Sequence, residues 1–258
     1  MIDAAKLFRL DGRNALVTGA SSGLGRHFAE VLASAGAAVA LAARRTDRLE
    51  VLADKIRENG RKAVCVALDV TNPASVAAGM EAAEKALGPI TVLVNNAGIA
   101  TDSRFLNVSE EEWRSVLDVN LDGVFRVGQA AAQRMVANKS GGTIINIASI
   151  LALGVIRRLS PYAASKGAVV QLTKAMALEL GRDNIRVNAI APGYVSTEMN
   201  ADFLMSEGGK KLLSRVPMGR AANLDELDGA LLLLASDAGR FMTGSVVTVD
   251  GGHAMAMG

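Results

Sequence analysis

The fold of this chain is decided by the stretch Ala15-Leu16-Val17-Thr18-Gly19-Ala20-Ser21-Ser22-Gly23-Leu24-Gly25. Its first three residues predict a buried strand, and a helical pattern begins as the glycines end. Small residues between the two let the backbone bend tightly and approach a pyrophosphate, whose charge would lie on the free N–H groups at the helix start. The residues expected to bind a dinucleotide here are Gly19, Ser21, Ser22, Gly23, Leu24 and Gly25.

Short apolar runs alternate with longer helical patterns along the rest of the chain. Strands are expected at residues 14–18, 38–42, 63–68, 91–94, 143–147, 186–190 and 246–249, and helices at 23–35, 46–59, 73–87, 110–137, 162–180 and 224–235. This alternation predicts right-handed βαβ units. We therefore expect an α/β fold: one doubly wound parallel sheet of about seven strands, a Rossmann fold, in a single domain over residues 1–258. Trp113 and Cys65 are expected to pack in its core.

Composition narrows the function classes. Lys and Arg exceed Asp and Glu by 28 − 26 = 2 charges, which does not favour a nucleic-acid or membrane partner. One cysteine and two histidines exclude a disulfide framework and a Cys/His metal site, so we expect no metal. The opening residues 1–13 lack the pattern of a secretory signal, and no apolar run reaches the ~20 residues that span a bilayer. A cytoplasmic protein is expected.

The glycine stretch has a rival interpretation, because Gly19-Ala20-Ser21-Ser22-Gly23 also matches the G-x-S-x-G nucleophile elbow of hydrolases. A triad of that type needs a histidine well downstream of the serine and of an acid. Only His27, close to the loop, and His253, near the end of the chain, are present. The sequence does not favour a hydrolase.

Arginines follow the second expected strand, where NAD sites carry an acidic residue for the ribose 2′-hydroxyl. The sequence there is Ala42-Ala43-Arg44-Arg45-Thr46. A guanidinium suits a 2′-phosphate, so Arg44 and Arg45 predict NADP(H) in preference to NAD(H). The alternative is a pair of solvated arginines at a helix start.

Tyr162 and Lys166 are four residues apart at the start of an expected helix, which places both side chains on one helical face. An ammonium beside a phenol, together with a positively charged oxidised nicotinamide, favours the phenolate and lowers the phenol pKa toward neutral pH. Three further features follow strands at the same sheet edge, where α/β sheets bind ligands. They are Ser149, the stretch Asn95-Asn96-Ala97-Gly98, and Pro192-Gly193.

With these motifs the chain resembles the short-chain dehydrogenases/reductases over about residues 13–252. The resemblance rests on the glycine stretch, Asn95–Gly98, Asn120, Ser149, Tyr162 with Lys166, and Pro192-Gly193. It implies an NADP(H)-dependent oxidoreductase that interconverts a ketone or aldehyde and an alcohol by hydride transfer, with Tyr162 as general acid/base.

The family pattern also implies individual roles. Ser149 would hold the carbonyl oxygen, Lys166 would bind the nicotinamide ribose and lower the phenol pKa, and Asn120 would anchor a proton-relay water. Further cofactor contacts would come from Asp69, Val70, Asn96, Ala97, Gly98, Pro192, Gly193, Val195 and Thr197. One departure is that NADP-binding relatives often carry a basic residue where this chain has Ser21 and Ser22.

The substrate stays open. The branches most similar in style are the ketoacyl-carrier-protein reductases and the gluconate dehydrogenases. The apolar residues 150–156 after Ser149 predict an apolar wall of the substrate site. Residues 199–216 predict an apolar lid, with Met199, Phe203, Leu204, Met205 and Leu212. Arg157 and Arg158 are expected to be either a solvated pair or an anion site. The family implies a homotetramer through the long helices and the last strand. His253 is assigned no role, and the alternative to an enzyme is a non-catalytic dinucleotide-binding redox sensor.

Overall fold

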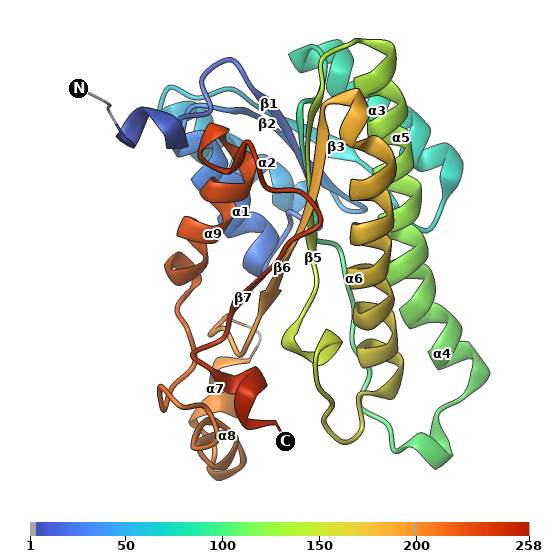
Figure 1. Cartoon of the computed structure of the whole chain (residues 1–258), viewed down its shortest axis with the longest axis vertical. Helices are drawn as coiled ribbons and strands as arrows, with labels where there is room; N and C mark the ends of the chain where they lie inside the picture. The colour runs from blue at the N-terminus through green and yellow to red at the C-terminus, as the bar shows by residue number, and fades with distance from the viewer. Residues whose placement is uncertain (1–3, 199, 258) are drawn as a thin grey trace.

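Seven parallel strands form the centre of the protein (Figure 1). The computed structural model describes residues 4–198 and 200–257. The strands lie in the order β3-β2-β1-β4-β5-β6-β7, and every neighbouring pair is parallel. They are β1 Asn14–Thr18, β2 Ala38–Ala43, β3 Ala63–Ala67, β4 Val92–Asn95, β5 Gly142–Ile147, β6 Ile185–Pro192 and β7 Val246–Val249. The prediction of an α/β fold with a doubly wound parallel sheet is confirmed.

Helices cover both faces of this sheet (Figure 1). On one face lie α1 Gly23–Ser34, α2 Asp47–Glu58 and α9 Asp228–Ala235; on the other lie α3 Pro73–Leu87, α4 Glu110–Leu117, α5 Gly123–Ala137 and α6 Ser160–Leu180. The short helices α7 Ala201–Met205 and α8 Glu207–Leu213 lie beyond the carboxyl end of β6, near the C-terminus. The chain winds outward from β1 on one side and from β4 on the other, so the order reverses between these two strands, where such folds bind ligands.

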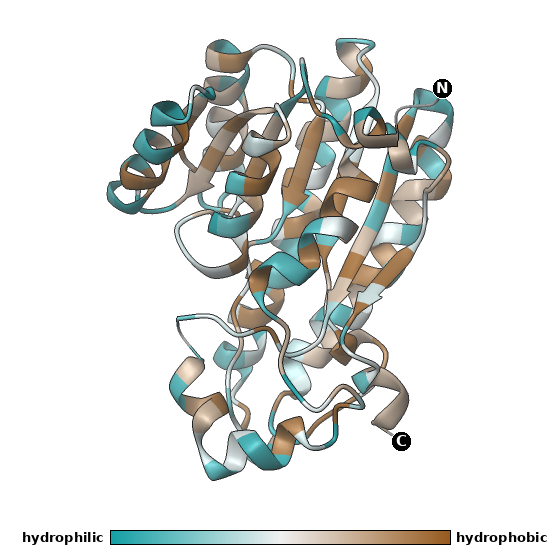
Figure 2. Ribbon diagram, turned by 90° about the vertical axis from the view of Figure 1, so that its left-hand side faces the viewer, coloured by the Kyte–Doolittle hydropathy of each residue, from teal (hydrophilic) through white to brown (hydrophobic). Residues whose placement is uncertain are grey.

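The core lies on both faces of the strands. One cluster joins β1 and β2 to α1, α2 and α9, and another joins the opposite face to α3 and α5. In Figure 2 the strands are predominantly hydrophobic and the helices carry hydrophilic residues on their outer turns. Because both faces of the central strands are buried, their continuous apolar runs are the pattern that this fold requires.

The expected helices and the expected core positions of Trp113 and Cys65 need correction. The helix expected over residues 110–137 is interrupted by a π-helical turn, Asp118–Asp122, and α7 and α8 were not predicted at all. Trp113 is only partly buried and lines a surface groove with Glu110 and Glu111, so it does not pack in the core. Cys65 is also only partly buried and packs at the margin of the core.

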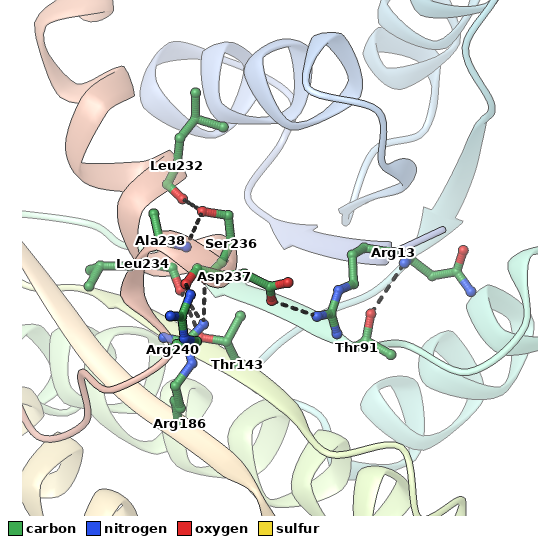
Figure 3. Close-up of polar contacts among 11 residues, drawn as sticks. Arg13, Thr91, Thr143, Arg186, Leu232, Leu234, Ser236, Asp237, Ala238 and Arg240 are labelled. Atoms are coloured by element: carbon green, nitrogen blue, oxygen red, sulfur yellow. Dashed lines mark hydrogen bonds and ion pairs between the residues drawn. The ribbon is translucent and has the colours of Figure 1, made fainter. Parts of the chain in front are cut away.

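A polar network holds the amino-terminal ends of the strands. Arg186 on β6 donates hydrogen bonds to the carbonyl oxygens of Leu234 (2.8 Å), in the last turn of α9, and of Ser236 (3.3 Å), directly after that helix (Figure 3). Arg13, just before β1, pairs with Asp237 at 3.0 Å. These bonds satisfy carbonyl groups at the helix end that have no partner within the helix. These contacts fix the sheet at the amino-terminal ends of its strands. The loops that carry the candidate site lie at the carboxyl ends.

Candidate active site

The glycine stretch forms the turn between β1 and α1. Gly19 has φ +67°, a left-handed conformation that glycine adopts without strain. A Cβ on Gly25 would lie 2.3 Å from the carbonyl oxygen of Gly19, so the helix can approach the turn this closely only with glycine at that position. Ser22 precedes α1, but its side chain makes no capping hydrogen bond. The first N–H groups of α1 are therefore not capped by this side chain, which suits an anion such as a pyrophosphate.

Thr18 ties this turn to the next strand of the sheet. Its hydroxyl oxygen accepts hydrogen bonds from the backbone N–H groups of Asn96 (3.0 Å) and Ala97 (3.1 Å). The Asn96 side chain donates to the carbonyl oxygens of Thr18 (2.9 Å) and Gly19 (3.3 Å). Asn96 thus holds the glycine turn against the loop after β4. No local pattern indicates that Thr18 ties these two loops together, because its partners are about 78 residues away along the chain.

The arginines expected at a 2′-phosphate lie at the end of β2. Arg44 and Arg45 are exposed, and within the described part of the chain neither forms an ion pair. Asp69, beyond β3, accepts hydrogen bonds at Oδ1 from the backbone N–H (2.9 Å) and hydroxyl (2.7 Å) of Thr71. These bonds lower the pKa of Asp69, and the positive charge of Arg44 lowers it further. Asp69 and Arg44 are therefore near neighbours, and the adjacent Val70 is buried.

Lys166 lies beneath the catalytic candidate Tyr162 on α6. The residue is 3% exposed, and its ammonium lies 5.6 Å from the centre of the Tyr162 ring and donates to the carbonyl oxygen of Ile147 at 2.7 Å. Burial lowers the pKa of Lys166 to about 8. Among the described residues nothing accepts its other two N–H groups, which leaves them for hydroxyl groups such as those of a ribose.

Burial and one hydrogen bond set the pKa of the Tyr162 phenol in the protein without its cofactor. Burial raises the pKa of Tyr162, and a side-chain hydrogen bond with Ser149 opposes the rise. The Ser149 hydroxyl also accepts from the backbone N–H of Leu151 at 3.1 Å, which fixes it at the end of β5. The structure therefore brings Ser149, Tyr162 and Lys166 together.

Asn120 is fully buried in the π-helical turn. Its side chain accepts from the N–H of Ile99 and donates to the carbonyl oxygen of Ile99, both at 2.8 Å, and donates to the hydroxyl of Ser165 at 3.1 Å. A Cβ on Gly98 would lie 3.4 Å from Asn120 Oδ1 and 3.6 Å from Lys166 Nζ. The loop after β4, the π-helical turn and α6 thus meet at Gly98.

The segment after β6 closes this edge of the sheet. Pro192 ends β6, and Gly193 donates its N–H to the carbonyl oxygen of Val249 at 2.9 Å. Val195 is buried and forms a bridge with Ala222. The N–H of Thr197 donates to the side chain of Asn200 at 2.8 Å.

The substrate side differs from the expectation in its details. Leu204 is buried, but Phe203 and Met205 are exposed, as are Leu153 and Val155 in the expected wall, so the apolar surfaces are only partly packed. Arg158 forms an ion pair with Asp102. The structure therefore does not leave Arg158 as an unpaired anion site. Met199 lies outside the described residues.

Sequence reasoning missed two residues at this edge, Tyr194 and His253. Their rings lie 5.3 Å apart, and His253 is 3% exposed with no partner for its buried Nδ1 atom. The tyrosine directly follows the Pro192-Gly193 motif, but nothing in the local pattern indicates that the C-terminal histidine returns to it.

The residues described at this edge fit a dinucleotide and an alcohol or carbonyl substrate. A helix start without a side-chain cap can hold a pyrophosphate, and two unpaired N–H groups of a buried ammonium can hold ribose hydroxyls. Residues 4–198 and 200–257 contain no cluster of His, Cys, Asp and Glu that could hold a metal ion. Nor does any described helix have the length and apolar character needed to cross a membrane.

Comparisons with known proteins agree with this chemistry. The family model described as "Enoyl-(Acyl carrier protein) reductase" matches residues 19–254. A 5-keto-D-gluconate 5-reductase from Escherichia coli (strain K12) is 41% identical, over 97% of this chain and 99% of that protein. A 3-oxoacyl-[acyl-carrier-protein] reductase from Vibrio cholerae is 37% identical, over 95% and 99%. The crystal structure of a gluconate 5-dehydrogenase from Burkholderia cenocepacia J2315 in complex with NADP and tartrate matches with a TM-score of 0.94 and 40% identity, over 98% of this chain and 99% of that one.

Proposed function

The chain belongs to the short-chain dehydrogenase/reductase family, and on that basis we propose that Tyr162 is the general acid/base of an NADP(H)-dependent oxidoreductase. The enzyme interconverts an alcohol and a ketone or aldehyde. The observation that carries the assignment of Tyr162 is the buried Lys166 ammonium, 5.6 Å from the Tyr162 ring and with two N–H groups unpaired among the described residues. A buried charge with one backbone partner is costly unless a ligand completes it.

The cofactor, when bound, supplies or accepts the hydride at its nicotinamide ring. The protein groups handle the proton. In reduction, the Tyr162 hydroxyl donates its proton to the substrate oxygen while Ser149 donates a hydrogen bond to the same oxygen. In oxidation, the phenolate of Tyr162 takes the hydroxyl proton of the alcohol. Lys166 binds ribose hydroxyls and stabilises the phenolate by its positive charge.

Asn120 contributes through its backbone turn rather than through its amide group. Both of its side-chain N–H bonds are already donated, to Ile99 and Ser165, so the amide has no donor left for a water molecule. A π-helical turn shifts the hydrogen bonds of a helix and leaves a carbonyl group without its usual partner. Such a carbonyl is a suitable anchor for the relay water that the family pattern assigns to Asn120.

The remaining cofactor contacts follow the strand ends. The N–H groups at Ser22–Gly25 would hold the pyrophosphate, and Arg44 and Arg45 would hold the 2′-phosphate. The residues that would hold the remaining parts of the cofactor are in the later loops: Asp69, Val70, Asn96, Ala97, Gly98, Pro192, Gly193, Val195 and Thr197. Three solved relatives whose names mention gluconate or 2-deoxy-D-gluconate were crystallised with NADP.

The substrate that we propose is a small polyhydroxylated acid of the gluconate type. Relatives named for 5-keto-D-gluconate and gluconate are 41% and 39% identical, against 37% for an acyl-carrier-protein reductase. Four solved relatives also carry gluconate or 2-deoxy-D-gluconate in their names.

The two alternatives have no support. For a hydrolase, the loop serines would need a free histidine, but the His27 ring pairs with Asp228 at 2.7 Å. For a redox sensor, the site would not need its proton-transfer residues, and the relatives reported above are named as reductases and dehydrogenases.

We also propose that one domain carries both binding functions, because the glycine turn and α6 belong to a single sheet and its helices. The assembly would be a homotetramer, supported by exposed apolar side chains such as Phe125 on α5 and Leu178 on α6. A cytoplasmic location would match the supply of NADP(H).

The test is substitution of the phenol. Tyr162→Phe should lower kcat at least 1,000-fold with NADPH and a ketone, while the Kd for NADPH changes less than threefold, since the ring stays and only the acidic proton is lost. Reduced-nicotinamide absorbance measures the first and fluorescence titration the second. Full activity of this variant would show that another group transfers the proton.

A further inference from the structure

The C-terminal segment of the chain lies against the candidate active site. Residues His253–Ala256 form a 3-10 turn that contacts the turn Ile150–Ala152, directly after Ser149. Ala254 and Met257 pack in the same apolar cluster as Tyr162. Ala254 and Met257 therefore form part of the apolar surroundings of the Tyr162 ring.

This segment is held in place by a built turn. The Asp250 carboxylate accepts the backbone N–H groups of Gly252 (2.9 Å) and Ala254 (2.7 Å), one on each oxygen. Gly251 and Gly252 both have positive φ, and Val216 and Pro217 pack against them. Because residues 216–217 end the segment that follows β6, the turn joins that segment to the C-terminus.

His253 is the polar group that this turn places inside. Its side chain is almost completely buried, and its Nδ1 atom has no hydrogen-bond partner within the described chain. Its ring lies 5.3 Å from that of Tyr194, at an interplanar angle of 35°. An apolar side chain of similar size would fill this place without the cost of an unpaired buried nitrogen, so packing alone does not explain a histidine here.

One charged group of each sign acts on the pair, the Asp250 carboxylate and the Arg215 guanidinium. Burial lowers the pKa of His253, which keeps the ring neutral at neutral pH; Asp250 opposes this shift and Arg215 adds to it. Burial raises the pKa of Tyr194, and Arg215 opposes that rise. The field of Arg215 thus reaches both rings, and its side chain is exposed without an ion pair among the residues described.

We propose that His253 and Tyr194 bind the distal hydroxyl groups of the substrate. This inference rests on the proposed function and names the residues that would select a small polyhydroxylated acid. A neutral imidazole offers one donor and one acceptor and a phenol offers both, which matches neighbouring hydroxyl groups.

The experiment compares 5-keto-D-gluconate with cyclohexanone, which has the reacting carbonyl but no other polar group. We expect His253→Leu to lower the ratio of kcat/KM for the acid to that for cyclohexanone at least tenfold, mainly through the KM of the acid. His253→Asn, which keeps a polar atom near the Nδ1 position, should recover part of the ratio. Tyr194→Phe should lower it severalfold, and the control Met255→Gln, on the same turn but exposed, should leave it within twofold.

An unchanged ratio in His253→Leu and Tyr194→Phe would overturn the inference, as would equal losses in His253→Leu and His253→Asn. A change of oligomeric state in His253→Leu with an unchanged ratio would assign His253 to a subunit contact and also overturn it. If the wild type reduces cyclohexanone but no polyhydroxylated acid, the inference falls and the proposed reaction stands. If it reduces no carbonyl compound with NADPH, the proposed function falls with it.

Discussion

At the scale of single residues, Lys166 couples the site to the stability of the fold. An amine with a pKa of 10.5 when unfolded and about 8 when folded binds more protons in the unfolded state between these values. The free energy of unfolding therefore rises with pH in this interval, and the cost of burying the charge is complete below pH 8. From pH 7 to pH 9.5 the gain is about 2 kcal/mol, at 1.36 kcal/mol per pH unit.

Replacing the amine by an apolar side chain should remove this gain. Between pH 7 and pH 9.5, we expect the free energy of unfolding of the wild type to rise by about 2 kcal/mol relative to that of Lys166→Met. Urea unfolding at matched protein concentration and ionic strength measures it. Lys174→Met, an exposed position on the same helix, is the control and should show no such shift. A parallel pH profile for wild type and Lys166→Met would mean that the buried amine keeps its ordinary pKa.

Arg44 and Arg45 are the residues that we propose select NADP(H) over NAD(H). Both are exposed without an ion pair in the described chain, so removing them should cost mainly the 2′-phosphate contact. Arg44→Ser/Arg45→Ser should lower kcat/KM for NADPH 10- to 100-fold and change that for NADH less than threefold. Arg48→Ser, one turn further on, is the control. Equal losses with both cofactors would assign the arginines to something other than the phosphate.

At the scale of elements, the hydroxyl of Thr18 joins two loops of the site. It accepts two backbone N–H groups, from Asn96 and Ala97, and an isosteric Thr18→Val would leave both without this partner. We expect a loss of about 2 kcal/mol or more in stability and a tenfold rise in the Kd for NADPH. Thr143→Val is the matched control, because it removes a buried hydroxyl that bonds Leu234 at the opposite edge. Similar Kd values in the two variants would show that Thr18 affects only stability.

The elements that sequence reasoning predicted are those whose pattern is local. The bounds of β1 and β7 agree with the expectation, since an apolar run between turn residues identifies a strand. The π-helical turn around Asn120 does not change the apolar period enough to be seen, because it is fixed by contacts with Ile99 and Ser165 on other elements. The sequence motifs likewise located Ser149, Tyr162 and Lys166, but the return of His253 to Tyr194 depends on tertiary packing alone.

At the scale of the whole molecule, the two edges of the sheet differ in how they are tied. At the amino-terminal edge, Arg186 bonds to the last turn of α9 and Arg13 pairs with Asp237 directly after it (Figure 3). At the carboxyl edge, the loops bond to one another, as Thr18 does to Asn96 and Asn120 to Ile99. The helix start at Ser22, the Lys166 ammonium and the His253 ring remain there with unused hydrogen-bonding capacity. This division gives a rigid frame and a ligand-binding edge within one sheet.

The proposed homotetramer can be tested at the outer surface of the long helices α5 and α6. Phe125 on α5 is 47% exposed and Leu178 on α6 is 85% exposed, and the proposed homotetramer would cover such apolar side chains at its interfaces. If α5 forms a contact between copies of the chain, Phe125→Glu should place a charge in an apolar interface and convert the tetramer to dimers or monomers. Light scattering after size-exclusion chromatography measures the mass, and Phe241→Glu, exposed near the start of β7, tests the contact through the last strand separately. A wild type that is monomeric at micromolar concentration would refute the assembly, whereas a tetramer unaffected by Phe125→Glu would move its interface away from α5.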